Sequence, residues 1–287
     1  MTRCIYLAVI ALLGLAVSSA GAHYNMLQPE PASTKRGTPV SITYRWGHPF
    51  EHQLFQAPAP AGFFVLSPEG KKTDLLPMLE KAEEPGVEQK PVTIYRLRFT
   101  PEQRGDYLFV LNTPPIWMEE DQEYLQDTVS VVLHVQAQKG WDADANQPFE
   151  MVPLTRPYGL QPGLVFQAQA RMTPLAQTDP NEYVAPALVS RAQAQAQARL
   201  SGGLVEIEHA NPVPPRELPP DEQITRAAKT DPNGIVSYTL PEAGWWCLTA
   251  LKEGEPMKDS QGKTVPLLRR ATFWVYVDAP LKSGAAP

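Results

Sequence analysis

His23 is the residue with the clearest capacity for chemistry in this chain of 287 residues. Residues 1–22 resemble an export signal, with a basic start, an apolar run and the small residues Ala20-Gly21-Ala22 before the cleavage point. Cleavage there would make His23 the first residue of the mature protein. Its free α-amine and its ring Nδ1 would then chelate a late first-row metal ion such as Cu(II) or Ni(II).

Two further histidines follow a predicted strand close to this N-terminus. Residues 39–46 alternate apolar and polar side chains, the period of a half-buried strand, and lead into His48 and His52. Pro49 lies between the two histidines and disfavours a helix, so they do not form the i,i+4 ligand pair of a metalloprotease. We expect a loop that presents them together.

These residues predict a metal site of nitrogen donors. An N-terminal strand that pairs with 39–46 returns His23 to the end of that strand, where His48 stands. We expect His23 and His48 to form the primary site, His52 to be the next candidate ligand, and Glu51 to orient a ligand ring. The alternative is that His48 caps a turn and His52 is simply exposed.

Other titratable residues have simpler explanations. His134 is expected to be a hydrogen-bonded strand residue, and Cys247, which follows two tryptophans, a small buried one. His209 ends a strand that also carries Glu206 and Glu208. These three could form a second cation site, although alternating glutamates are commonly a solvated sheet face.

Composition excludes several classes of protein. The net charge of −6 leaves no basic face for nucleic acid. The mature part holds one of the two cysteines, Cys247, so no internal disulfide is expected, and no second apolar run is long enough to span a membrane. The Gly-x-Ser-x-Gly, phosphate-loop and His-Glu-x-x-His motifs are all absent, so no enzyme is predicted.

The remaining pattern predicts an all-β protein. Proline makes up 31 of the 287 residues and separates runs of β-branched and aromatic residues, as in chains of many short strands and turns. We expect two immunoglobulin-like β-sandwich domains after a cleaved signal peptide. The expected divisions are a signal peptide at 1–22, a first domain at 23–138 with the metal site, a linker at 139–145, a second domain at 146–278 and a disordered tail at 279–287.

Three segments lie outside these strands or are ambiguous. Residues 114–126, with four acidic side chains, are expected to form a loop or short helix. The Ala/Gln run 191–200 is expected to be an inserted helix or mobile loop. Asp231-Pro232-Asn233-Gly234 is a strong turn signal.

The chain resembles a large bacterial family of exported β-rich proteins that is described as a periplasmic component of nickel or cobalt uptake. The resemblance lies in residues 22–29, in 46–51, and in 230–234 with 240–246. It implies a periplasmic or secreted protein that binds Ni²⁺ or Co²⁺ beside an inner-membrane metal transporter. Asn25 stands where many members carry a second histidine, which removes one potential ligand.

A second likeness points to copper. A histidine at a processed terminus before a β-sandwich is similar to periplasmic copper carriers and, more remotely, to copper-dependent polysaccharide oxidases with a histidine brace. The turn at 231–234, followed by the 240–246 segment, also looks like exported immunoglobulin-like modules that bind or adhere without catalysis. Binding of Ni²⁺ or Co²⁺ without turnover is the expectation, with Cu²⁺ binding and a purely structural role as alternatives.

Overall fold

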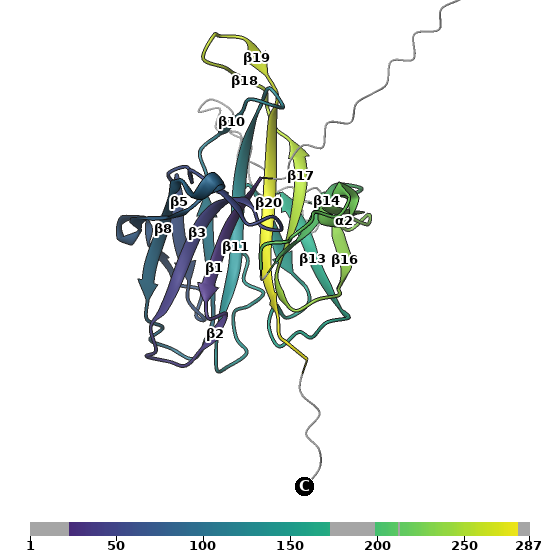
Figure 1. Cartoon of the computed structure of the whole chain (residues 1–287). Helices are drawn as coiled ribbons and strands as arrows, with labels where there is room; N and C mark the ends of the chain where they lie inside the picture. Colours follow the sequence, from purple (N-terminus) through teal and green to yellow (C-terminus); the bar gives the residue numbers. More distant parts are fainter. Residues whose placement is uncertain (1–22, 173–198, 212, 281–287) are drawn as a thin grey trace, which may run out of the picture.

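The computed structural model describes residues 23–172, 199–211 and 213–280, and this part of the chain is almost entirely β-structure (Figure 1). The prediction of an all-β sandwich fold is confirmed. The alternating runs form the expected strands because their side chains point to opposite faces in turn. Val92–Phe99 and Gly105–Asn112, for example, fall within strands of almost the same bounds.

The described strands form three larger sheets and one small hairpin. The first sheet has the order β1-β3-β8-β7 with β4 beside β3, and comprises β1 (Tyr24–Glu30), β3 (Val40–His48), β4 (Gln53–Phe55), β7 (Glu80–Pro85) and β8 (Pro91–Phe99). The third has the order β12-β13-β16, with β12 (Phe149–Pro153), β13 (Leu164–Met172) and β16 (Ile235–Leu240). The projecting hairpin is β18 (Met257–Lys258) with β19 (Thr264–Val265).

The second sheet is the largest and runs through the whole molecule. Its order is β15-β14-β17-β20-β11-β9-β5-β6, with β2 and β10 also paired to β11. Its strands are β2 (Ser33–Thr34), β5 (Gly62–Leu66), β6 (Lys72–Asp74), β9 (Gly105–Asn112), β10 (Ile116–Met118), β11 (Glu123–Val135), β14 (Leu204–Ala210), β15 (Arg226–Lys229), β17 (Gly244–Glu253) and β20 (Leu267–Val277). Short helical turns at η1 (Leu76–Met78), η2 (Val87–Gln89) and α2 (Asp221–Ile224) complete the elements.

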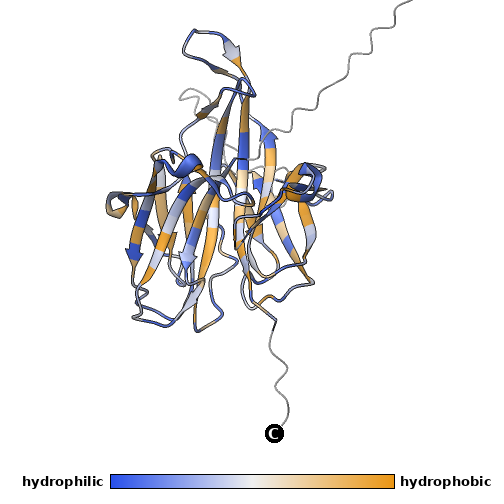
Figure 2. Cartoon of the chain, viewed as in Figure 1, coloured by the Kyte–Doolittle hydropathy of each residue, from blue (hydrophilic) through white to orange (hydrophobic). Residues whose placement is uncertain are grey.

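The large sheet is covered on both faces, by different partners. Residues of β5, β9, β11 and β20 alternate between two buried clusters: Phe63 and Phe109 pack with the first sheet, whereas Phe64 and Val110 pack with the third. This explains why the strands read as nearly continuous apolar runs, since both side-chain sets are buried. Figure 2 shows apolar residues along these central strands.

The two predicted domains therefore share one sheet. β11, from the first, pairs in parallel with β20, from the second, from Tyr124 opposite Leu267 to Val131 opposite Trp274. Residues 139–145, the predicted linker, form an irregular connection between β11 and β12 with one turn at Trp141 and Asp142. The boundaries drawn along the sequence stay a prediction, but the halves they separate are joined by backbone hydrogen bonds.

The acidic segment 114–126 differs from its prediction as a loop or helix. Ile116–Met118 forms β10 and pairs with Glu123–Leu125, the first residues of β11, so the segment is a β-hairpin whose acidic tip is exposed. The apolar run Ile116-Trp117-Met118 is too short to indicate a strand by itself. Most of the Ala/Gln run 191–200 and residues 281–287 of the tail lie outside the described residues.

A buried ion pair links the two halves behind β1. Arg270 donates from Nε to Asp127 Oδ1 at 2.8 Å and from Nη2 to Oδ2 at 2.6 Å, and both side chains are almost fully buried. Asn25 Nδ2 also donates to Asp127 Oδ2 at 2.6 Å, and the Asn25 carbonyl accepts the indole N–H of Trp274. This network anchors β1 to the central sheet. It thereby also holds His23, which lies two residues before Asn25.

No helix in the described ranges has the length and apolar character needed to cross a membrane.

Candidate metal site

The strand pairing places His23 opposite His48. β1 runs antiparallel to β3 with Tyr24 opposite Gly47, so the register continued by one residue sets His23 across from His48. The two imidazole centroids are 4.4 Å apart, with the rings at 64°. The predicted meeting of these two residues is therefore observed, and it arises from the antiparallel return that the sequence suggested.

Aromatic side chains enclose the His23 ring. It stacks on Trp46 with centroids 5.4 Å apart and lies 5.0 Å from the ring of Phe55, which belongs to β4. Phe55 also contacts His48 edge-on at 5.4 Å. These contacts restrict the rotamers of both histidines and lower the entropy lost when they bind a ligand together.

The tight hairpin between β3 and β4 determines where His48 points. Residues 49–52 connect His48 to Gln53, its direct partner across the hairpin. Gly47 has φ of +153°, and a Cβ there would lie 2.0 Å from the carbonyl oxygen of Gln53. Glycine is needed because the backbones approach this closely.

His48 has the protonation state that a metal ligand needs. Burial lowers the pKa of His48, which favours the neutral ring near pH 7. Its Nε2 is buried and has no hydrogen-bond partner among the described residues. A buried imidazole nitrogen without a partner is costly, and coordination of a metal ion would remove that cost.

Glu51 and His52 lie in the same hairpin but differ in role. Burial raises the pKa of Glu51, whereas the positive charge of protonated His23 lowers it, which places the two groups within electrostatic reach. Glu51 Oε2 is buried without a partner in the described part of the chain. His52 is exposed, has a φ of 58°, and its Nε2 contacts the carbonyl oxygen of Asn211.

Two glutamates of β14 approach the site from the other half of the molecule. The backbone N–H of Phe50 donates to Glu208 Oε1 at 3.3 Å, and Tyr24 OH lies 3.4 Å from Glu206 Oε2. Burial, with the nearby Glu51 carboxylate, raises the pKa of Glu208 to about 8. Glu206 and Glu208 are thus not a solvated sheet face, and the alternation of these glutamates in the sequence does not indicate their burial.

His209 points away from these glutamates, so the three do not form a second cation site. Successive residues of a strand face opposite sides, and His209 stacks on Trp246 at 4.6 Å in the other core. His134 is the hydrogen-bonded strand residue that we expected, with Nδ1 2.7 Å from Asp106 Oδ1. Cys247 is fully buried, as expected.

A cavity of about 460 Å³ borders the site and opens it to small solutes. His48 and His52 line it from the first half of the chain, and Asn211 and Trp245 line it from the second. Within the described ranges, no three side chains of histidine, cysteine, aspartate or glutamate are arranged to hold a metal ion. The side chains thus bring two imidazoles together, and the α-amine of a processed His23 would be the third donor.

Residues 20–173, which carry this site, match the profile of the family described as "Domain of unknown function (DUF4198)". The chain belongs to the DUF4198 family. The match covers the first half of the molecule, with β1, β3 and β4, and extends through β13. No curated protein matches the chain.

Solved structures resemble the chain only remotely. Escherichia coli alpha-2-macroglobulin is 10% identical, over 91% of this chain and 14% of its own, with a TM-score of 0.22. A DUF3823 family protein from Bacteroides uniformis is 14% identical over 79% of this chain and 94% of its own, also with a TM-score of 0.22. The chain thus spans about a seventh of the macroglobulin, and similarity at this level supports no inference about function.

Proposed function

We propose that this DUF4198 protein binds a transition-metal ion, Ni²⁺ or Co²⁺, outside the cytoplasm. In this proposal the protein is an accessory of an inner-membrane metal transporter. The observation that supports it is the contact of the His23 and His48 rings at 4.4 Å, in a pocket where the buried Nε2 of His48 has no partner among the described residues. The choice of Ni²⁺ or Co²⁺ as the metal rests on the sequence resemblance described above.

The donor set of the proposed site is the His23 amine and ring with the ring of His48. Imidazole and amine nitrogens suit late first-row divalent ions, and the metal is the cargo in this proposal. Glu51, whose buried Oε2 has no partner among the described residues, would accept a hydrogen bond from one of the rings once the metal is bound. His52 is a further ligand only if it leaves Asn211. In this proposal binding proceeds without turnover, since the resemblance implies a metal-binding accessory and not an enzyme.

Copper binding by a histidine brace is the second candidate. The same pair of residues, a processed His23 and His48, would hold Cu²⁺, which binds nitrogen sites more tightly than Ni²⁺. A copper carrier would bind Cu²⁺ reversibly, whereas an oxidative enzyme would produce peroxide or cleave glycans in the presence of a reductant. These outcomes separate the copper enzyme from a binder.

The experiment is calorimetric titration of Ni²⁺, Co²⁺ and Cu²⁺ into protein exported by its host, whose first residue is established by N-terminal sequencing. Both His48→Ala and a variant with one residue added before His23 should weaken binding at least about tenfold, or about 1.4 kcal/mol. His134→Asn is the matched control, since it removes an imidazole engaged with Asp106 elsewhere.

Two results would contradict the proposal. One is an N-terminus other than His23, since the amine would then be missing from the site. The other is binding of all three metals that survives both changes unaltered, which would leave a structural or adhesive role.

A further inference from the structure

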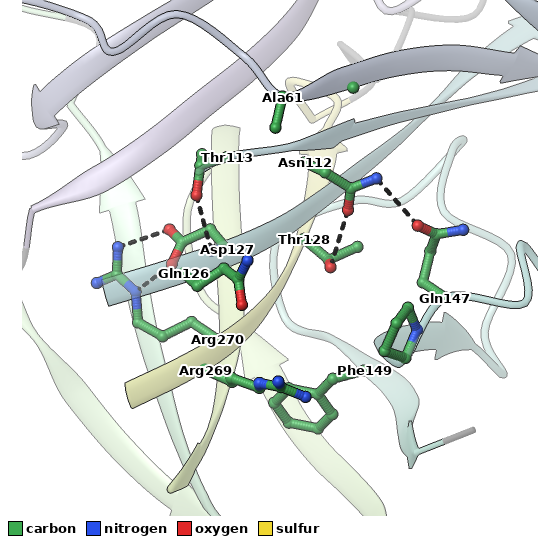
Figure 3. A pocket seen from close by; sticks show the side chains of 12 residues that line it. Ala61, Asn112, Thr113, Gln126, Asp127, Thr128, Gln147, Phe149, Arg269 and Arg270 are labelled. Atoms are coloured by element: carbon green, nitrogen blue, oxygen red, sulfur yellow. Dashed lines mark hydrogen bonds and ion pairs between the residues drawn. The ribbon is translucent and has the colours of Figure 1, made fainter. Parts of the chain in front are cut away.

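A second cavity lies away from the histidines, where β11, β20 and the start of β12 meet. It has a volume of about 360 Å³, which is at the small end of the range for ligand sites. Figure 3 shows side chains from both halves of the chain around it. Those with polar groups are Asn112, Thr113, Gln126, Asp127, Thr128, Gln147, Arg269 and Arg270.

The charges of this cavity leave one guanidinium without a counterion. Asp127 receives two hydrogen bonds from Arg270 and one from Asn25, so its carboxylate is fully engaged. The side chain of Arg269 forms no ion pair or hydrogen bond within the described ranges, and its Nε is buried without a partner. One positive charge therefore remains, at Arg269.

Gln126 stands directly beside Arg269. The two residues are cross-strand partners in the parallel pairing of β11 and β20, so their side chains lie on the same face of the sheet. The carboxamide of Gln126 also makes no hydrogen bond to any described residue, and Figure 3 shows it reaching into the space above Arg269. A guanidinium and a carboxamide, both unpaired and adjacent, can donate together to one carboxylate.

The opposite wall suits hydroxyl groups. Thr128 donates to Asn112 Oδ1 at 3.1 Å, and Asn112 donates to Gln147 Oε1 at 3.0 Å, which fixes the orientation of the amides and leaves further donors and acceptors for a ligand. Phe149, a buried core residue that is 4% exposed, lies beside Arg269 and closes the cavity on the core side (Figure 3). A small ligand with one carboxylate and several hydroxyls matches these two polar walls.

We propose that this cavity binds a small hydroxylated monocarboxylate of the sugar-acid class. Arg269 and Gln126 hold the carboxylate, and the Asn112–Thr128 side orders the hydroxyls. A single uncompensated positive charge matches a monoanion better than a phosphate dianion, and the polar walls disfavour an apolar ligand. The same chemistry is offered by a free sugar acid and by the end of an acidic polysaccharide.

The experiment is calorimetric titration of D-galacturonate into the full protein with a chelator present, beside D-galactose, inorganic phosphate and a trimer of galacturonate. D-galacturonate should bind at least about tenfold more tightly than D-galactose or phosphate, a difference of about 1.4 kcal/mol. A trimer that binds more tightly still identifies a polysaccharide end as the source, and one that binds no better identifies the free acid.

Variants assign the binding to this cavity. Arg269→Gln and Gln126→Ala should each weaken D-galacturonate binding at least about tenfold, whereas Arg98→Gln on the exposed face of β8 and His48→Ala should leave it unchanged. Gln126→Ala keeps the test valid if the arginine variant does not fold. No D-galacturonate binding at about 10 mM, equal binding of D-galactose or phosphate, or no effect of either variant would overturn the proposal.

Discussion

Removing the Asp127 carboxylate should strongly destabilise the protein. In Asp127→Ala, the guanidinium of Arg270 loses two hydrogen bonds, at 2.8 and 2.6 Å, in a position where its side chain is 4% exposed. An ion left without its partner in the interior costs about 3–5 kcal/mol. The amide of Asn25 loses its acceptor as well, which adds about 1–3 kcal/mol.

The expected loss is therefore at least about 4 kcal/mol, a large part of the 5–15 kcal/mol that typically separates folded and unfolded states. Urea unfolding followed by tryptophan fluorescence measures it. Glu69→Ala is the matched control, since it removes a carboxylate paired with Lys139 at the surface, where both side chains are more than half exposed. That pair is worth about 0–1 kcal/mol.

A double substitution separates the pair from its surroundings. Asp127→Leu with Arg270→Met removes both charges and keeps apolar volume, so it should be much less destabilising than Asp127→Ala alone. A loss below about 1 kcal/mol in Asp127→Ala would refute the reasoning, because it would mean that water or another group reaches Arg270. Equal losses in the single and double variants would show that packing, and not the stranded charge, accounts for the effect.

Two other predictions concern a buried carboxyl and a glycine. Burial, with the adjacent Asp144, raises the pKa of Glu150 to about 8, so folding favours its protonated form. The free energy of unfolding should therefore fall as pH rises from 4.5 to about 8, by at most about 5 kcal/mol. Glu150→Gln should reduce this dependence in urea titrations at several pH values, part of it remaining through Glu208, and an unchanged slope would contradict the assignment. Gly47→Ala should lower the melting temperature and abolish high-affinity metal binding, because the new Cβ would clash with the Gln53 carbonyl oxygen. Metal binding as tight as in the wild type would contradict this prediction and show that the hairpin adapts to the Cβ.

The sequence by itself determined the strands and one half of the site. Alternation with period 2 indicates strands such as 92–99 and 235–240 without reference to the rest of the chain, because it depends only on local backbone geometry. The meeting of His23 and His48 could also be predicted, because it needs only one antiparallel pairing between two neighbouring strands. β1 and β3 are neighbours in the sequence, and their register brings the two residues together.

Tertiary structure alone decided what surrounds the two histidines. Glu208, which lies 158 residues after its contact Phe50, reaches the site from β14, and no local pattern distinguishes its inward position from that of an exposed glutamate. The same holds for the parallel pairing of β11 with β20, which joins the two predicted domains and creates the cavity between Gln126 and Arg269. The order of strands that are distant in sequence depends on how whole apolar faces pack against one another. It is determined by the sum of many contacts, so no single segment of the sequence predicts it.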